Sequence, residues 1–392
     1  MARLSMRSGD IRPSPVRDML NVSQRPGMIS FAGGLPAPET FAGLELPPPP
    51  RDLLQYGPTE GEPALRERIA QDLAALGLDT EPDRVLLLSG SQQGIDLTAK
   101  LTIDAGTRLA VESPAYLAAL QVFRFYGARF QVTDRADPAA GWAEGPPALA
   151  YVIPTFQNPT GQCWSADERQ AMAQACQAHD VILFEDDPYR DLVYEPCERR
   201  PACAWMKTGS WIYQGSFSKT VAPGLRLGYL TASRDLFPFL VQLKQAADLH
   251  TNRLSQWMVL QYLNDPGRAE RMARVADLYR RKRGVFAQAL TRHLGNMASW
   301  SLPPGGLFFW LTLKGDVGVE ALLKNAVERG VLFTPGSHFL AEGGASPTIR
   351  LNFSLAEPEA AERGLAILAE LLREAGEPSP INRHSRPCGG NP

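Results

Sequence analysis

Between residues 84 and 232, short apolar runs alternate with longer stretches whose apolar positions repeat every three or four residues. The longer stretches, at 91–100, 115–126 and 165–178, have the period of amphipathic helices. The short runs predict strands with the sequences "RVLLL" (84–88), "RLAVES" (108–113), "RFQVT" (129–133), "ALAYVIP" (148–154), "VILFED" (181–186), "SWIYQGS" (210–216) and "LGYLTA" (227–232). Such strands separated by helices indicate an α/β fold in which helices cover both faces of a mostly parallel sheet.

The rest of the chain predicts a smaller α+β domain and two terminal segments. Helical patterns fill 235–295, and they are followed by "LFFWLTL" (307–313), a helix near 318–329, "TIRLNFS" (348–354) and a helix over 357–374. The first fifty residues are rich in proline and glycine. We therefore expect an N-terminal arm over 1–50 that packs on the small domain, a large domain over 51–290, a small domain over 291–376 and a disordered tail over 377–392.

Composition and charge exclude several classes of protein. The net charge of -2 and the pI near 6.3 do not favour binding to nucleic acid or to an anionic membrane. The basic run at 280–283 is interpreted as a solvated helix face. Five cysteines and five histidines are scattered without metal-ligand spacing, so no metal site is expected. The odd cysteine count and the absence of a signal peptide or membrane-length apolar run predict a cytoplasmic protein.

Polar residues gather in the loops that follow the predicted strands, where ligands collect in sheets of this kind. A helix start at Gly90-Ser91-Gln92 offers backbone N–H groups to an anion. An amide, Asn158, lies in "FQNPTG" (156–161), where a plain turn is the competing interpretation. Three carboxylates end a buried strand in "EDDPY" (185–189), which is costly unless they serve a cation. The sequence "SFSKTVAPGLRLGY" (216–229) adds Ser216, Ser218, Lys219 and Arg226.

One ligand would use all of these groups. A phosphate suits the helix start, two hydroxyls and an arginine, and an aldehyde suits a lysine. A protonated ring nitrogen suits a buried carboxylate, and a phenolic oxygen suits an amide and a tyrosine hydroxyl. Pyridoxal 5'-phosphate has all four groups, and its protonated ring accepts electrons from the substrate Cα.

The chain resembles the class I/II aminotransferases, which are fold-type I pyridoxal phosphate enzymes. The stretches that carry the resemblance are "SGSQQGIDL" (89–97), "ESPAY" (112–116), "FQNPTG", "EDDPY", "SFSKTVAPGLRLGY" and "RLNFS" (350–354). They occur in the family's order across most of the chain. Two N-terminal stretches, "ISFAGGLPAPETF" (29–41) and "QYGPTEGEPALRERIA" (55–70), are similar to the kynurenine and 2-aminoadipate aminotransferase branch.

The resemblance implies roles for the residues around the cofactor ring. Lys219 would bond to the aldehyde and then carry a proton between the substrate Cα and the cofactor. Asp186 would pair with the ring nitrogen, while Tyr189 and Asn158 would hold the phenolic oxygen. Glu185 and Asp187 alternate to the other side of the strand and are expected to be structural.

The resemblance also implies a phosphate site and a homodimer. Residues that would hold the phosphate are Ser91, Gln92, Ser216, Ser218 and Arg226, and Tyr116 would stack on the ring. Tyr56 and "HTN" (250–252) are similar to positions that family members contribute from a neighbouring subunit. For Asn252, a helix N-cap is the competing interpretation.

For the substrate, the resemblance implies that Arg350 binds the α-carboxylate beside Asn158. An arginine inside an apolar strand is hard to explain as structure alone. Gly34 is a further candidate in the substrate site. In "RPSPVRDML" (12–20), Ser14 and Arg17 would face the substrate side chain, although the prolines at 13 and 15 are expected to limit helix formation there.

The function implied is transfer of an amino group from an L-amino acid to a 2-oxo acid, 2-oxoglutarate being the expected acceptor, by a ping-pong mechanism. A lyase, decarboxylase or condensation reaction on the same scaffold is the first alternative, because such enzymes share the cofactor residues. The second is the effector half of a transcription regulator, which is disfavoured because only about fifty residues precede the family match.

Overall fold

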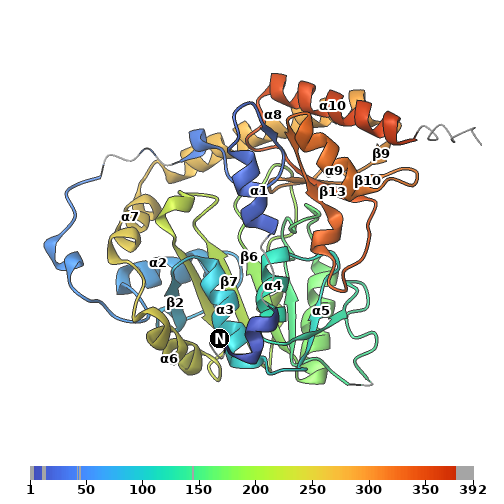
Figure 1. The fold of residues 1–392 in the computed structure, drawn as a ribbon. Helices are drawn as coiled ribbons and strands as arrows, with labels where there is room; N and C mark the ends of the chain where they lie inside the picture. Colours follow the sequence, from blue (N-terminus) through green and yellow to red (C-terminus); the bar gives the residue numbers. More distant parts are fainter. Residues whose placement is uncertain (1–3, 11–14, 42, 44–45, 144, 377–392) are drawn as a thin grey trace, which may run out of the picture.

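The computed structural model describes residues 4–10, 15–41, 43, 46–143 and 145–376. A large sheet with its helices forms the lower part of the molecule in Figure 1, and α8, α9 and α10 with a smaller sheet form the upper part. The α-helices are α1 Pro15–Ser23, α2 Pro63–Ala74, α3 Ser91–Thr102, α4 Leu117–Phe125, α5 Ala166–His179, α6 Phe237–Asp248, α7 Arg253–Asn264, α8 Arg268–Leu294, α9 Val319–Glu328 and α10 Pro358–Gly376.

The large sheet has seven strands in the order β2-β8-β7-β6-β5-β3-β4. Only β8 runs antiparallel to its neighbours, and the other pairs are parallel. Its strands are β2 Val85–Leu88, β3 Arg108–Val111, β4 Arg129–Val132, β5 Leu149–Val152, β6 Ile182–Asp187, β7 Trp211–Ser216 and β8 Gly228–Ala232. Every strand that the apolar runs predicted is present, and the fold class is confirmed.

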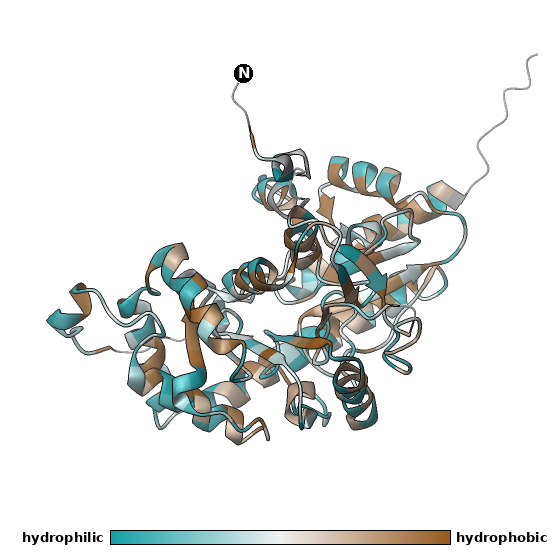
Figure 2. Cartoon of the chain, turned by 90° about the horizontal axis from the view of Figure 1, so that it is seen from below, coloured by the Kyte–Doolittle hydropathy of each residue, from teal (hydrophilic) through white to brown (hydrophobic). Residues whose placement is uncertain are grey.

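Two hydrophobic layers enclose this sheet. One contains apolar residues of α3, α4 and α6, and the other contains those of α2, α5 and α7. Figure 2 shows helices striped in teal and brown, as expected when a helix buries one side and exposes the other. Because β3 to β7 run parallel, their carboxyl ends meet at one edge of the sheet, where the polar loops gather.

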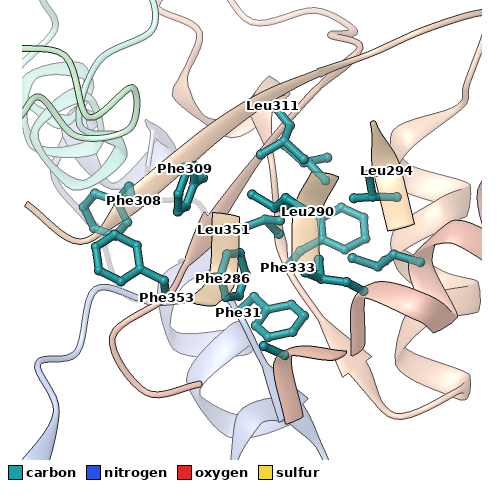
Figure 3. Packing of buried hydrophobic residues seen from close by; sticks show 14 of the residues in the cluster. Phe31, Phe286, Leu290, Leu294, Phe308, Phe309, Leu311, Phe333, Leu351 and Phe353 are labelled. Atoms are coloured by element: carbon teal, nitrogen blue, oxygen red, sulfur yellow. The ribbon is translucent and has the colours of Figure 1, made fainter. Parts of the chain in front are cut away.

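The smaller sheet is antiparallel, in the order β12-β13-β10-β9. Its strands are β9 Ala298–Ser299, β10 Phe308–Leu313, β12 Thr334–Pro335 and β13 Thr348–Asn352. Figure 3 shows aromatic and leucine side chains of this sheet packed with Phe286, Leu290 and Leu294 of α8. Residues of α8 from Val275 onward join this core, so part of the segment that was expected in the large domain packs with the small sheet. The division of the chain at residues 290 and 291 remains a proposal.

The N-terminal segment contacts both parts of the chain. Strand β1 (Ile29–Ser30) pairs in parallel with β11 (Val331–Leu332), and Phe31 enters the small-domain core. Nearer the start, the Arg7 guanidinium lies 5.3 Å from the ring centroid of Tyr126, which follows α4. The expectation that prolines limit helix formation here is wrong for α1. Pro15 is its first residue, where the fixed φ of proline suits a helix and no N–H is needed.

Candidate active site

A cavity of about 1010 Å³ opens at the carboxyl ends of the parallel strands. Its walls come from the start of α3, from the length of α4, from the loops after β5, β6 and β7, and from residues 337–343 of the small domain. The predicted site residues that line it are Ser91, Gln92, Tyr116, Asn158, Asp186, Tyr189, Ser216, Ser218, Lys219 and Arg226. The fold therefore gathers residues that span 136 positions of the sequence around one space.

The Asp186 carboxylate lies near the end of β6 and reaches this cavity. Its Oδ2 accepts a hydrogen bond of 2.7 Å from the Tyr151 hydroxyl, whereas its buried Oδ1 has no partner. Burial raises the pKa of this carboxyl to about 6, while the nearby Gln214 amide and the Tyr151 hydroxyl limit the rise. An unpaired buried carboxylate oxygen is unfavourable unless a donor arrives from the cavity.

The neighbouring carboxylates point to the opposite side of β6, as the alternation predicted. Glu185 accepts a hydrogen bond from the Cys203 backbone N–H at 2.9 Å and lies 3.7 Å from the Arg169 guanidinium. Asp187 accepts one from the Tyr213 hydroxyl at 2.8 Å. Strand alternation thus leaves Asp186 alone of the three to face the cavity.

The Lys219 amine is held at the cavity wall by the N-terminal segment. Its Nζ donates to the Gly34 carbonyl oxygen at 2.7 Å and lies 5.9 Å from the Tyr189 ring centroid. Burial, together with the charges of Arg226 and Arg350, lowers the pKa of Lys219 to about 8. At pH 7 a pKa near 8 leaves roughly a tenth of the amine uncharged, far more than for an ordinary lysine, so this amine can act as a nucleophile near neutral pH.

Asn158, Tyr189 and Arg350 form a connected group. Asn158 Nδ2 is 3.4 Å from the Tyr189 hydroxyl, and Arg350 Nη1 donates to Asn158 Oδ1 at 2.7 Å. Arg350 does not line the cavity wall itself, but Asn158 does. The Arg350 guanidinium contacts two rings, with its Cζ 4.3 Å from the Phe308 centroid and 4.9 Å from the Phe339 centroid, and its buried Nε has no partner.

Burial lowers the pKa of Arg350 to about 10, so its side chain stays charged at neutral pH. A buried guanidinium without a carboxylate partner is unfavourable in the absence of a ligand. The planar fork of donors suits a carboxylate from solution.

At the other end of the cavity, α3 begins at Ser91, directly after Gly90 with φ 85°. A Cβ on Gly90 would lie 2.6 Å from Arg226 Nη2, and a Cβ on Gly228 would lie 2.8 Å from the Ser91 backbone nitrogen. Two glycines therefore let the Arg226 guanidinium and β8 approach the N-terminus of α3. The Ser216 hydroxyl accepts a hydrogen bond from the Ser218 backbone N–H at 3.1 Å. This end offers N–H groups, hydroxyls and a guanidinium to an anion.

Tyr116 occupies the position before α4, and its side chain lines the cavity. Burial and the Asp186 carboxylate raise the pKa of its hydroxyl to about 12. A flat aromatic ring next to that carboxylate is suited to contact a heteroaromatic ligand.

The remaining predicted residues lie elsewhere. Tyr56 is 76% exposed, lies outside the cavity lining, and makes an edge contact with the His250 ring. Asn252 is the N-cap of α7 and accepts from the Ser255 backbone N–H at 2.9 Å, so the helix-cap interpretation describes it within one chain. Ser14 lies outside the described residues, and Arg17 lies in the first turn of α1.

Sequence reasoning did not identify Tyr151, Phe308 or the wall formed by α4 and residues 337–343. A hydroxyl within the apolar strand "ALAYVIP" was the available signal for Tyr151. For Phe308 there was none, because an aromatic residue in an apolar strand is ordinary core. The wall contains Val122 and Phe125 beside Arg124 and His338, so it offers both apolar and polar contacts.

Comparisons with known proteins point to one family. The family described as "Aminotransferase class I and II" matches residues 50–368. A 2-aminoadipate transaminase of Thermus thermophilus is 35% identical over 93% of this chain and 95% of its own length.

Two solved structures are similar over nearly the whole chain. An α-aminoadipate aminotransferase of Thermus thermophilus, complexed with N-(5'-phosphopyridoxyl)-L-leucine, is 33% identical with a TM-score of 0.83, covering 95% of this chain and 97% of that one. A kynurenine aminotransferase of Pyrococcus horikoshii is 30% identical with a TM-score of 0.86, covering 96% and 98%.

Proposed function

Because this chain belongs to the class I and II aminotransferases, we propose that the residues around its cavity form the active site in the roles set out below. The protein transfers amino groups between amino acids and 2-oxo acids, with pyridoxal 5'-phosphate as its cofactor. The observation that carries the residue assignment is the unpaired Oδ1 of Asp186, a residue that lines the same cavity as Lys219.

The donor set fits this cofactor. A ring N–H would satisfy Asp186 Oδ1, and the Tyr189 hydroxyl with the Asn158 amide would hold the phenolic oxygen. The phosphate would lie at the N-terminus of α3, where Ser91, Gln92, Ser216, Ser218 and Arg226 line the cavity. Tyr116 would cover one face of the ring.

When bound, the cofactor supplies a ring that accepts the electron pair released at the substrate Cα. Lys219 would move the proton. Its amine, with a pKa near 8, would remove the proton from the substrate Cα and deliver it to the cofactor carbon that bonds the transferred nitrogen. Asp186 remains ionised at neutral pH because its pKa of about 6 lies below 7, and its charge favours a protonated ring nitrogen.

Arg350 binds the α-carboxylate of the substrate. Its Nη1 stays on Asn158, and its unpaired Nε leaves a donor for a carboxylate oxygen. Amino acids and 2-oxo acids share this carboxylate, so one arginine serves both halves of a ping-pong cycle with 2-oxoglutarate as acceptor.

The substrate side chain lies toward the wall formed by α4 and residues 337–343. Arg124, Val122 and His338 give that wall both polar and apolar contacts. Such a wall suits both 2-aminoadipate and kynurenine, after which two of the similar proteins are named. Arg17 and Ser14 would contribute from the N-terminal segment, and Gly34 would border the site through its contact with Lys219.

The working protein is a homodimer with shared active sites. Leu54 and Tyr56 are 90% and 76% exposed, in the blue segment that stands out at the left of Figure 1. Apolar side chains this exposed favour an interface, and Tyr56 of one copy would reach the phosphate in another.

The cysteine side chains support a location in a reducing compartment such as the cytoplasm. In the part of the chain that the structure describes, the free thiols are those of Cys163, Cys176, Cys197 and Cys203. Among the described residues, no helix combines the length and hydropathy needed to cross a membrane.

The test is a single half-reaction. A suitable amino acid alone should convert the cofactor stoichiometrically to its amine form, and 2-oxoglutarate should restore the starting spectrum. A panel of donors would then identify the preferred side chain. Continuous release of ammonia or carbon dioxide without an acceptor would show a lyase or decarboxylase instead.

A further inference from the structure

Gln214 on β7 is a fully buried glutamine whose amide has no hydrogen-bond partner. Its exposed fraction is 0%, and both Nε2 and Oε1 are unpaired. Burying an amide without a partner is unfavourable. Other buried glutamines are satisfied, since Gln256 accepts from the Glu62 backbone N–H at 2.7 Å and donates to the Thr251 carbonyl at 2.8 Å. The unpaired amide of Gln214 is therefore an exception among the buried glutamines of the described residues.

The strand register places Gln214 beside Asp186. The two residues are direct partners in the parallel pair of β6 and β7. Phe184 and Ile212, two positions earlier on each strand, lie together in the layer under α3 and α4. Because side chains two apart share a face, Asp186 and Gln214 lie on that face as well. An unpaired carboxylate oxygen and an unpaired amide therefore occupy adjacent positions.

Helix α3 leaves room for this amide. A Cβ on Gly94 would lie 2.2 Å from Gln214 Oε1, closer than any real contact. Glycine weakens a helix interior relative to alanine, and here its lack of a side chain accommodates the glutamine. Gly94 and Gln214 thus form a matched pair beneath the first turns of α3.

We propose that Gln214 is a positioning residue for the reaction, whose amide N–H orients the Asp186 carboxylate and keeps it ionised opposite the cofactor ring nitrogen. The inference rests on the proposed assignment of Asp186 to that nitrogen. A carboxylate has about four acceptor positions, so it can hold the Tyr151 hydroxyl, the ring N–H and this amide together.

Other groups around Asp186 do not supply this effect. Tyr151 from β5 already donates to Oδ2. Asp187 is the adjacent carboxylate and raises the pKa of Asp186. Tyr116 and Tyr189 are neutral at pH 7, because burial raises the pKa of each hydroxyl. The Gln214 amide is the donor available on the same face, and it lies close enough to Asp186 to lower the pKa of that carboxyl even though no hydrogen bond of good geometry joins the two.

The experiment measures cofactor affinity of the apoprotein against pH, from about pH 5 to pH 9, in wild type and in Gln214→Met. Methionine keeps the length of the side chain and removes the donor. The midpoint at which affinity is lost on acidification should rise by about one pH unit, because the ionised carboxylate loses a hydrogen bond. Gln214→Glu, which places a second acid beside Asp186, should move the midpoint at least as far, because two adjacent carboxylates disfavour ionisation of one another.

Two further variants separate the possible results. Gln177→Met is the control, because Gln177 Oε1 accepts from the backbone N–H groups of Lys207 and Thr208 away from the cavity, and its midpoint should match wild type. Asp186→Asn should abolish the loss of affinity centred near pH 6 and leave in place the pH dependence that Lys219 causes near pH 8. If Asp186→Asn has this effect but Gln214→Met keeps the wild-type midpoint, the role proposed for Gln214 is wrong and the role proposed for Asp186 stands.

If Asp186→Asn leaves the profile unchanged, both assignments fail together. Apoprotein stability gives a second readout. A merely structural glutamine would lower the thermal midpoint when replaced, without shifting the pH profile. In contrast, Gln214→Met removes two unpaired buried atoms, so the apoprotein should be no less stable than wild type. Should Gln214→Met fail to fold, the pH midpoint of Gln214→Glu decides: a wild-type value would refute the proposal.

Discussion

Arg350 Nη1 donates a hydrogen bond of 2.7 Å to Asn158 Oδ1, which joins β13 of the small sheet to the loop after β5 of the large sheet. The two residues are 192 positions apart in the sequence. One amide therefore contacts both the guanidinium assigned to the substrate carboxylate and, through Nδ2, the Tyr189 hydroxyl assigned to the cofactor. Substrate and cofactor are positioned against a common residue.

Arg350→Ala should weaken the amino donor and the 2-oxo acid acceptor alike, by roughly 10- to 100-fold each, since a charged hydrogen bond is worth about 1.5–3 kcal/mol. The spectrum of the bound cofactor should persist, because Arg350 is not assigned to it. KM and kcat of both half-reactions provide the measurement, with Arg350→Lys as the matched charge-retaining variant. A loss confined to one substrate would contradict a shared carboxylate site.

Borohydride should fix the cofactor covalently on Lys219. Lys244 is the natural comparison, because it is also buried but its Nζ contacts Asp248, Gln93 and Thr251. Lys219 lines the cavity and donates to the Gly34 carbonyl, whereas Lys244 is outside the cavity lining and is held by a carboxylate. Peptide mass spectrometry after reduction locates the adduct, and an adduct on Lys244 or another lysine would overturn the assignment.

The bond between Lys219 and the cofactor should form faster as pH rises, levelling off above about pH 8. Burial lowers the pKa of Lys219 to about 8 from 10.5, and only the neutral amine attacks an aldehyde. Stopped-flow absorbance of apoprotein mixed with cofactor measures this rate. A midpoint near the ordinary lysine value would show that the amine is not perturbed in solution.

Asp186→Asn should retain the cofactor but lower the rate by about 10²–10³-fold, the range for removing one electrostatic partner of a reacting group. Asp187→Asn is the control, because that residue faces Tyr213 on the other side of β6. If Asp187→Asn abolishes activity and Asp186→Asn does not, the two acids have been assigned the wrong way round.

Asp186→Asn should also stabilise the apoprotein at neutral pH. Burial raises the folded-state pKa of Asp186 from 3.8 to about 6, so the folded chain binds this proton more tightly than the unfolded chain. Ionisation of this buried carboxyl lowers the free energy of unfolding. The loss is absent below about pH 4, grows between the two pKa values and is complete above about pH 6. The free energy of unfolding of Asp186→Asn should therefore exceed that of wild type by up to about 3 kcal/mol at pH 7 and by little at pH 4. Urea unfolding at the two pH values measures this difference. An equal gain at both pH values would contradict this account.

Much of the fold could be predicted because each strand carries its own apolar run, so that "VILFED" and "SWIYQGS" identify β6 and β7 without long-range information. Alternation along β6 also separated Asp186 from Glu185 and Asp187. The family motifs placed the cavity-lining residues in order. These signals are local, and the sequence contains them in full.

What could not be predicted depends on contacts between distant segments. The pairing of Gln214 with Asp186 requires the register of two strands, and the hydroxyl of Tyr151 reaches Asp186 from a third. Pro15 was interpreted as a helix breaker because its position within a turn was unknown. The exposure of Tyr56 likewise follows from where the whole segment lies, which no local pattern contains.

The hydrogen bond from Lys219 Nζ to the Gly34 carbonyl links residues 185 positions apart. A neutral amine has two hydrogens and loses them as it bonds to an aldehyde, so the N-terminal segment and the cofactor compete for one nitrogen. A Cβ on Gly34 would lie 3.2 Å from the Phe308 ring, which leaves this peptide little freedom to move aside. Thermodynamic reciprocity then requires that loading the cofactor loosens the segment, and that a change in the segment alters how readily Lys219 reacts.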